Sequence, residues 1–357
     1  MAANRRILAR LRPLYDWYGQ PERLDSFVSH GPPGAHAYRP DSRVAIFRWI
    51  NKYNGLDPTT VKDCDYKRIP EEQLRVFPED SDFPPDAINS KADETFVRLA
   101  QVKLPDAAGF EAWKRDLLGK LRTHSFQRFP ERIPVSDRVP TPGVFKFKDL
   151  PDVDLLQTRT TEIGIEVTLR VLGLDTQGEP GEKGVTLVVL NEDDSDMTGA
   201  PAWAKPFVGH DAVVLLAPRG SGPNRLTGKS PPNFVPRALA LLGQTLDDGR
   251  VWDIASTARW LERKAEVRVV GRGQAGILAA YAGLFEPAIR HVVVIDPPLS
   301  HRNGPYFLNV LRTLDIPEAL GLLAPTPLTL VQARDRAFDR TAEIYRLAGA
   351  SKSLKRE

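Results

Sequence analysis

Six short runs of branched apolar residues in the second half of the chain constrain its fold more than any other feature. They occupy residues 165–172, 185–190, 212–216, 267–270, 292–295 and 328–331. The last four runs are apolar nearly throughout, as strands covered on both faces must be. Helical patterns fall between or after the runs, at residues 235–243, 252–264, 276–284 and 338–348. The sequence therefore predicts an α/β fold with a doubly wound, mostly parallel sheet, whose carboxyl edge is the place to look for chemistry.

Composition excludes several classes of protein. The 357 residues suffice for two units, or for one large α/β unit with an appendage. Lys and Arg number 49 against 46 Asp and Glu, so the net charge of +3 gives no basic field for nucleic acid. The single Cys64 excludes a disulfide or a cysteine zinc cluster, and no apolar run approaches the roughly 18 residues of a membrane span. We therefore expect no metal, cofactor, nucleic acid or membrane as partner.

The first 150 residues divide into a predicted αβα unit, residues 1–55, and a predicted linker, residues 56–150. The unit is expected to contain a helix, a strand and a second helix, at residues 5–18, 23–29 and 43–50. Its arginine-rich start lacks the apolar core of a secretory signal, and we interpret it as a core helix rather than a transit peptide. The linker is rich in Asp, Pro and Lys, and its expected elements are a strand and a helix, at residues 73–77 and 109–126.

The most informative segment, residues 269–282, reads as a strand, a sharp turn and a helix. Small residues at the turn let the two backbones approach each other: Gly271, Gly273, Ala275 and Gly276. In the pattern Gly-x-Ser-x-Gly, the serine at the strained tip of such a turn is a nucleophile. Here Gly273 holds the serine position and Ala275 that of the second glycine. A glycine has no hydroxyl, so the usual acyl-enzyme cannot form at this turn.

The same turn also matches the Gly-x-Gly-x-x-Gly pattern of dinucleotide-binding loops. Asp296 follows about 20 residues later, the separation expected of a ribose ligand. The turn follows the fourth strand of the run instead of opening the fold, so nucleotide binding is the minor alternative.

The turn, the strand order and the loop Gly34-Ala-His-Ala-Tyr38 together resemble the α/β-hydrolase superfamily, specifically the acetyl xylan esterase-like proteins. Residues 5–53 resemble the end of one such domain, and residues 160–350 resemble most of a second. The resemblance implies a hydrolase fold for both stretches, which together cover about two-thirds of the chain.

The resemblance also implies roles for two residues. His36 holds the family's general-base position, and Asp335 holds the position of the acid that orients the base. In the family an eighth strand and a histidine should follow Asp335, but the residues after Ala350 show no strand pattern and contain no histidine. We therefore expect the hydrolase-like domain, residues 151–350, to lack its last strand, and residues 351–357 to form a tail.

Two arrangements would explain a histidine segment near the front of the chain. In one, the αβα unit is a remnant of an upstream hydrolase domain, and His36 is idle. In the other, a circular permutation, strand 23–29 docks beside strand 328–331 and brings His36 to Asp335. Both stay open at this stage, as does the possibility that an intact catalytic domain precedes these residues in a longer chain.

The loop 218–224 follows a strand and offers backbone N–H groups to a carbonyl oxygen or an anion. Within it, Gly220 and Ser221 are candidate ligands. Ser221 is also a weak candidate for a displaced nucleophile, provided that a base lies within hydrogen-bond reach. Loops of Gly, Ser and Pro are usually plain turns, which is the competing interpretation.

A second polar cluster follows the strand at 292–295. Asp296, Ser300 and His301 place a carboxylate, a hydroxyl and an imidazole where a cleft would open. His301, held by Asp296 or Asp335, is either a weak alternative base or, as we favour, a structural side chain. The candidate substrate ligands are therefore Gly220, Ser221, Gln274, Asp296 and Ser300.

These observations favour one function and leave a second open. The first is an α/β-hydrolase-like relative of acetyl xylan esterases that lacks the serine nucleophile and acts as an accessory or inactive domain. The alternative is a carbohydrate acetyl esterase with a non-standard arrangement that uses Ser221, or a water activated by His36 or His301. The resemblance implies an acetylated polysaccharide or a small ester as ligand. It also implies relatives that are often exported, although no signal is apparent here; the sequence fixes neither compartment nor oligomeric state.

Overall fold

The computed structural model describes most of the chain. The described residues are 2–31, 38–92, 96, 98–134, 155–159, 165–172, 184–194, 197–208, 212–222, 234–263 and 265–357. The chain divides into two compact units, residues 1–87 and residues 88–357, and each is described by itself. No helix within the described ranges is long and apolar enough to cross a lipid bilayer.

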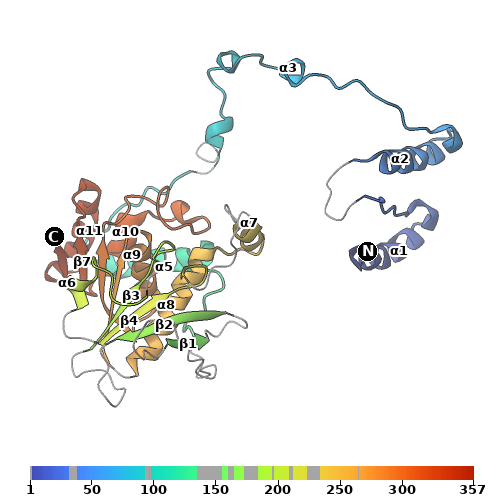
Figure 1. The fold of residues 1–357 in the computed structure, drawn as a ribbon. Helices are drawn as coiled ribbons and strands as arrows, with labels where there is room; N and C mark the ends of the chain where they lie inside the picture. The colour runs from blue at the N-terminus through green and yellow to red at the C-terminus, as the bar shows by residue number, and fades with distance from the viewer. Residues whose placement is uncertain are drawn as a thin grey trace. The chain divides into compact units, whose positions relative to one another are not determined.

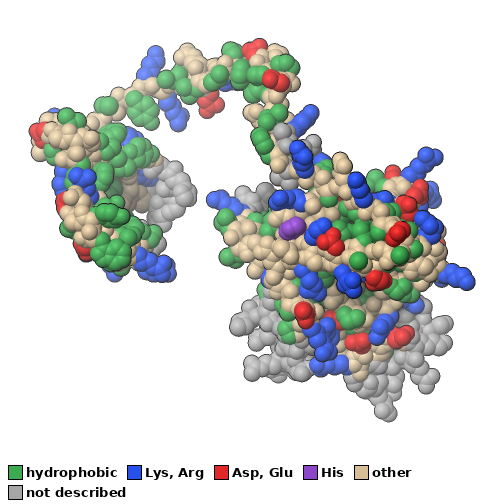
Figure 2. Space-filling model, turned by 180° about the vertical axis from the view of Figure 1, so that it is seen from behind, with side chains coloured by type: hydrophobic (Ala, Val, Ile, Leu, Met, Phe, Trp, Pro, Cys, Tyr) green, Lys and Arg blue, Asp and Glu red, His purple; other side chains and the backbone are tan. Residues whose placement is uncertain are grey.

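The N-terminal unit contains two long helices, α1 (Ala2–Trp17) and α2 (Pro40–Tyr53) (Figure 1). Pro40 has the fixed φ that suits the first helical position, and Asp41 adds a negative charge to the first turn. The remaining elements are a short helix α3 and three 3₁₀ turns, at Glu71–Leu74, Pro21–Arg23, Pro58–Thr60 and Asp80–Asp82. None of the side chains described between residues 5 and 87 is buried, and hydrophobic side chains show on the surface of this unit (Figure 2).

The two helices expected in this unit are confirmed as α1 and α2. The two expected strands, at 23–29 and 73–77, are wrong. Residues 24–30 are irregular, and the helix α3 covers the start of the second predicted strand. No described segment of this unit forms a neighbouring strand, and a strand needs a partner to satisfy its backbone hydrogen bonds.

The C-terminal unit is built on a sheet covered by helices (Figure 1). The sheet has eight strands in the order β1-β2-β4-β3-β5-β6-β7-β8. β2 pairs antiparallel with β1 and β4, and the other neighbours pair in parallel. The predicted α/β fold with a doubly wound, mostly parallel sheet is therefore confirmed, and only β1 and β8 are additions to it. The strands are β1 (Leu155–Arg159), β2 (Glu166–Leu172), β3 (Val185–Val189), β4 (Ala212–Ala217), β5 (Val267–Arg272), β6 (Ile289–Ile295), β7 (Leu328–Val331) and β8 (Leu354–Arg356).

The strand β8 corrects the prediction that the domain at 151–350 lacks its last strand and ends in a tail. β8 pairs in parallel with β7, with Leu354 opposite Leu328. Its pattern is hard to recognise because it has only three residues, of which Lys355 and Arg356 are exposed, as is common on the edge of a sheet.

β8 also contradicts the strand pairing that one of the two arrangements considered for the N-terminal segment requires. The permuted arrangement requires a strand at 23–29 beside β7. That segment is not a strand, and β8 occupies the free edge of β7. The predicted pairing of 23–29 with 328–331 is therefore wrong.

Helices pack against the sheet and bury one large hydrophobic cluster, beside two smaller ones. α8 and α9 lie against the central strands, and α10 packs on both α9 and α11. The helices expected between or after the strands are confirmed as α7, α8, α9 and α11, whereas α10 was not expected. The bounds are α5 (Phe110–His124), α6 (Lys205–Val208), α7 (Phe234–Leu241), α8 (Leu246–Glu262), α9 (Gln274–Phe285), α10 (Ile316–Gly321) and α11 (Asp339–Leu347), with 3₁₀ turns at Asn89–Lys91, Val310–Arg312, Arg336–Phe338 and Ser351–Ser353.

The helix α5 belongs to this core. Its Phe110, Leu117 and Leu121 are buried in the same cluster as the sheet. The helix expected at 109–126 is confirmed, but its apolar stripe attaches it to the sheet domain. The prediction of a linker over 56–150 is therefore wrong for this helix, because an apolar stripe must pack against another element, and here that element is the sheet domain.

Candidate functional site

The connection between β5 and α9 is a tight turn at the carboxyl edge of the sheet. Gly273 lies at its tip with φ +58° and ψ −126°, and α9 begins at the next residue. The Gly273 N–H donates to the carbonyl of Ile295, the last residue of β6, at 2.8 Å. This bond ties the tip to the neighbouring strand. Because φ is positive, a residue with a side chain would be strained here.

Two glycines of this turn are required by close approach, and the third is not. A Cβ atom on Gly271 would lie 2.6 Å from the backbone of Ala275, and one on Gly276 would lie 2.6 Å from Val294 Cγ1. A Cβ atom on Gly273 would meet no heavy atom within 4 Å. The turn is therefore tightly packed at its base and open at its tip, where the chain carries no side-chain oxygen.

Asn191 caps the first turn of α9. Its Oδ1 accepts the N–H of Ala275 at 3.1 Å, one of the donors that a helix start leaves without an intrahelical partner. Asp194 holds Asn191 in place, since its Oδ2 accepts the Asn191 backbone N–H at 2.8 Å. The helix start favours negative charge at the tip, such as a polarised carbonyl oxygen. Sequence analysis missed Asn191, although its position just after a buried parallel strand was an available signal.

Two further residues at the same edge have left-handed backbone conformations. Asp296 (φ 49°) directly follows β6, and Gln332 (φ 58°) directly follows β7. The Asp296 N–H donates to Val331, and the Gln332 N–H donates to Glu357, each at 2.9 Å. With Gly273, three neighbouring strands thus end on a residue with positive φ. Such strain is concentrated at functional sites, and the exposed side chains of Asp296 and Gln332 are available to a ligand.

Of the remaining predicted ligands, Gln274 and Ser300 also lie at this edge. Gln274 is the first residue of α9, and its side chain is exposed beside the tip. Ser300 is half-buried, and its Oγ accepts the N–H of Arg302 at 3.2 Å. Gln274 can reach a ligand freely, whereas Ser300 already supports the turn that follows β6. Gln332 was missed because a residue after a strand gives no sequence signal of a positive φ unless it is glycine.

Of the predicted pair, His36 and Asp335, only Asp335 belongs to the described residues. His36 lies outside the described residues, so its contact with Asp335 stays a prediction. Asp335 is exposed and caps the turn Arg336–Phe338, where its Oδ1 accepts the Ala337 N–H at 2.8 Å. Its carboxylate lies just beyond the end of β7, and one oxygen is used by the turn.

The loop after β4 does not present Ser221 to a substrate. Ser221 is 1% exposed, and its Oγ donates to the carbonyl of Pro218 at 2.6 Å. The flanking Gly220 (φ 72°) and Gly222 (φ 49°) allow the tight backbone path. The hydroxyl thus stabilises its own loop, and the geometry does not support Ser221 as a displaced nucleophile or as a ligand.

Buried ion pairs hold this loop against α8. Arg219 contacts Asp253 twice, at 2.9 Å from Nε and 2.7 Å from Nη2, and Asp253 is fully buried. Arg250 donates to Asp247 at 2.9 Å and to the carbonyl of Gly220 at 3.3 Å. Sequence analysis missed these contacts because charged residues on a helix are usually exposed.

His301 is held by partners other than those expected. Its Nδ1 donates to the carbonyl of Pro305 at 2.8 Å, because that oxygen can only accept, and its Nε2 accepts from Tyr281 Oη at 2.8 Å. The His301 backbone N–H donates to Asp315 at 2.8 Å. Neither Asp296 nor Asp335 fixes the ring, so that part of the prediction is wrong. Burial lowers the pKa of His301, and the neutral ring has both nitrogens occupied, which does not support a role as general base.

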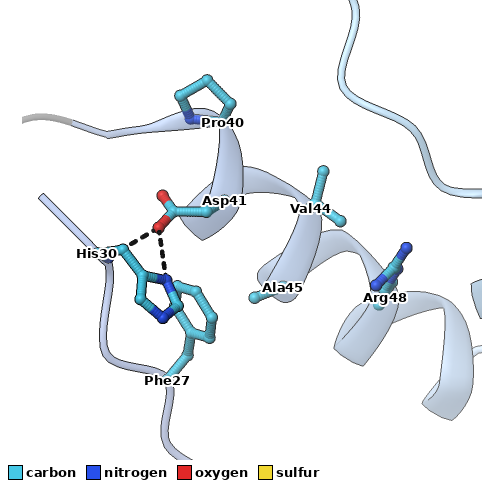
Figure 3. Close-up of a pocket in the computed structure, with 7 residues that line it drawn as sticks. All are labelled: Phe27, His30, Pro40, Asp41, Val44, Ala45 and Arg48. Carbon is cyan, nitrogen blue, oxygen red and sulfur yellow. Dashed lines mark hydrogen bonds and ion pairs between the residues drawn. The ribbon is translucent and has the colours of Figure 1, made fainter.

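The N-terminal unit contains one further polar cluster, at a cavity of about 340 Å³ (Figure 3). Asp41 accepts the Ser29 hydroxyl at 2.9 Å and the His30 N–H at 3.0 Å, and these bonds lower the pKa of its carboxyl. Ser29 therefore donates to a carboxylate and not to an imidazole, which is the wrong order for an activated hydroxyl. The lining residues are Phe27, His30, Pro40, Asp41, Val44, Ala45 and Arg48. Within the described parts of the chain, no three His, Cys, Asp or Glu side chains are grouped to hold a metal ion.

Comparisons with known proteins identify the fold. The sequence matches no protein-family model and no curated protein. Among solved structures, the chain is similar to a Bacteroides fragilis protein provisionally assigned as an acetyl xylan esterase, with 16% identity, a TM-score of 0.52, and coverage of 73% of this chain and 78% of that one. A glucuronoyl esterase from Sporotrichum thermophile has 10% identity and a TM-score of 0.43, with coverage of 72% of this chain and 79% of that one. A glucuronoyl esterase from Caldicellulosiruptor kristjansonii has 12% identity and a TM-score of 0.44, with coverage of 74% of this chain and 88% of that one. The chain thus has the α/β-hydrolase fold.

Proposed function

We propose that this protein uses its α/β-hydrolase fold to bind a carbohydrate ester without forming a serine acyl-enzyme. Gly273 carries the proposal. It holds the tip of the turn between β5 and α9, where a Cβ atom would enter open space, and it has no hydroxyl to attack a carbonyl. The similarity in fold to a protein assigned as an acetyl xylan esterase supports an acetylated polysaccharide, or a small ester, as the class of ligand.

Ser221 and His301 do not replace the missing serine, and His36, the other imidazole considered for this chemistry, lies outside the described residues. Ser221 is buried and donates to its own loop, and both ring nitrogens of His301 are bonded to buried partners. A nucleophile needs a free base within hydrogen-bond reach, and neither residue offers one.

The groups that remain at the carboxyl edge are suited to binding. The amide of Gln274, the carboxylate of Asp296 and the amide of Gln332 are exposed there. Side-chain amides can donate to and accept from sugar hydroxyls, a carboxylate accepts from them, and the start of α9 favours an ester carbonyl oxygen. Binding without cleavage uses all of these groups and requires no residue that the turn lacks.

The test combines hydrolysis and binding. We expect the purified chain to hydrolyse p-nitrophenyl acetate no faster than buffer, and to bind an acetylated xylo-oligosaccharide saturably in calorimetry. Asp296→Asn should weaken this binding about tenfold, because it removes a charged acceptor while asparagine tolerates the left-handed backbone. The matched control is Glu131→Gln, an exposed acidic residue outside the site.

Two results would overturn the proposal. Hydrolysis that Ser221→Ala abolishes would establish an esterase with a non-standard arrangement. An oligosaccharide affinity that is undetectable, or is the same in Asp296→Asn and Glu131→Gln, would exclude this edge as the binding site.

A further inference from the structure

The helix α1 has an apolar stripe that is mostly exposed in the described part of its own unit. Ile7, Leu11, Leu14 and Tyr18 recur at the spacing of one helix face. Ile7 is 54%, Leu14 42% and Tyr18 81% exposed, and Leu11 is half-buried. Trp17, at the end of the helix, is 80% exposed. The sequence predicts a core helix here, but in the N-terminal unit this face is open.

Arginines surround this stripe. α1 contains four arginines and a single acidic residue, Asp16. By helical geometry Arg10 lies next to Leu14 at one border of the stripe, and the other three arginines lie farther round the helix. No ion pair within the described chain involves them, so their charge is not neutralised by this unit. They are Arg5, Arg6, Arg10 and Arg12.

This combination favours a lipid surface over a second copy of the helix. The spacing of the stripe would also fit a coiled coil, but it lasts for only about two heptads, and stable pairing needs about three or four. Two copies would in addition bring eight like charges together. A helix with arginines on its polar side, Leu, Ile and Tyr on the other and a Trp at its end matches helices that lie in the interface of a bilayer.

We propose that α1 is an interfacial helix that attaches the chain to an anionic lipid surface. Ile7, Leu11 and Leu14 enter the boundary between headgroups and acyl chains, and the arginines extend to the lipid phosphates. Trp17 and Tyr18 have the amphipathic rings that collect at that depth. This contact requires no membrane-spanning segment, and it replaces the expectation, drawn from the absence of a span, that no membrane is a partner.

The experiment measures cosedimentation of the whole chain with vesicles. One set contains phosphatidylcholine with 30% phosphatidylglycerol, and the other contains phosphatidylcholine alone. We expect binding to the anionic vesicles that weakens with added salt, and little binding to the neutral ones. Arg10→Gln combined with Arg12→Gln should lower the partition coefficient about 25-fold, at roughly fivefold for each charge. Leu11→Glu combined with Leu14→Glu should abolish binding.

A matched control separates α1 from other exposed apolar surface. Leu241 and Leu242, at the end of α7 in the C-terminal unit, are 82% and 71% exposed. Replacing both by Glu introduces the same change as the α1 double variant, and should leave vesicle binding unaltered. Thermal unfolding of each variant shows whether the fold is intact.

Three results would overturn the proposal. The first is equal binding to neutral and anionic vesicles, which would remove the role of the arginines. The second is loss of binding in the α7 control to the same extent as in the α1 variant. The third is absence of vesicle binding together with a dimer in sedimentation that Leu11→Glu with Leu14→Glu dissociates, which would assign the stripe to a second copy.

Discussion

The turn between β5 and α9 can be tested by adding a methyl group at two of its glycines. In Gly271→Ala, the new Cβ would lie 2.6 Å from the carbonyl carbon and oxygen of Ala275 and from the N of Gly276. These backbone atoms belong to the first turn of α9, so the strand β5 and the helix must separate. Overpacking of a rigid core costs about 1–3 kcal/mol and occasionally more, and we expect about 3 kcal/mol here.

Gly273→Ala adds the same methyl group at the tip, where no heavy atom lies within 4 Å. Its cost comes only from the backbone conformation, φ +58° with ψ −126°, at about 1–3 kcal/mol, and is partly offset by the lower entropy of the unfolded chain. We therefore expect Gly273→Ala to lower the free energy of unfolding by about 1 kcal/mol, against about 3 kcal/mol for Gly271→Ala. Urea unfolding followed by circular dichroism measures both. Equal losses would refute the distinction between a packed base and an open tip.

Two other predictions concern charge inside the C-terminal unit. Arg219→Met should lower the free energy of unfolding, measured by thermal unfolding, by about 3–5 kcal/mol, because the buried carboxylate of Asp253 loses its ion-pair partner. The control Arg290→Met breaks an exposed ion pair with Glu262 and should lower it by less than about 1 kcal/mol. Burial, with Arg268 and Lys355 nearby, lowers the pKa of His291 to about 4. The unfolded state binds a proton on His291 near pH 6.5, before the folded state does, so the free energy of unfolding should fall as the pH drops from about 6.5 towards 4. Urea melts at pH 7 and about pH 4.5 measure this fall, which should be smaller in His291→Gln than in the native chain.

The sheet could be predicted from the sequence because its inner strands are buried on both faces. Strands such as 212–216 and 292–295 must then be apolar throughout, and this pattern does not depend on which helices or strands cover them. β8 has no such pattern, since a strand at the edge is stabilised by backbone pairing with β7 and can carry Lys355 and Arg356. The converse failure is the segment 23–29, whose apolar residues match a strand but find no partner to pair with.

The candidate site was predictable only in part, for a related reason. The turn at Gly273 has a local signature, because a tight strand-to-helix connection needs small residues at fixed spacing. The bonds that join His301 to Tyr281 and Arg219 to Asp253 have no such signature. Tyr281 is 20 residues from His301 along the chain, and Asp253 is 34 from Arg219, so these pairs become visible only when the strands and helices are assembled.

The strained residues beside the turn are better evidence that a ligand binds at this edge than the turn at Gly273 is. A glycine at positive φ costs little, so Gly273 could persist in a sheet that binds nothing. Gln332 is different, because a residue with a long side chain in the left-handed region costs on the order of 1 kcal/mol or more, and glycine or asparagine would relieve that cost. The residue directly follows β7, next to the strand that Asp296 follows, and its amide is exposed at the end of the parallel strands. A chain with no use for this edge gains nothing from keeping that conformation, whereas a chain that binds a polar ligand there gains a fixed hydrogen-bonding group.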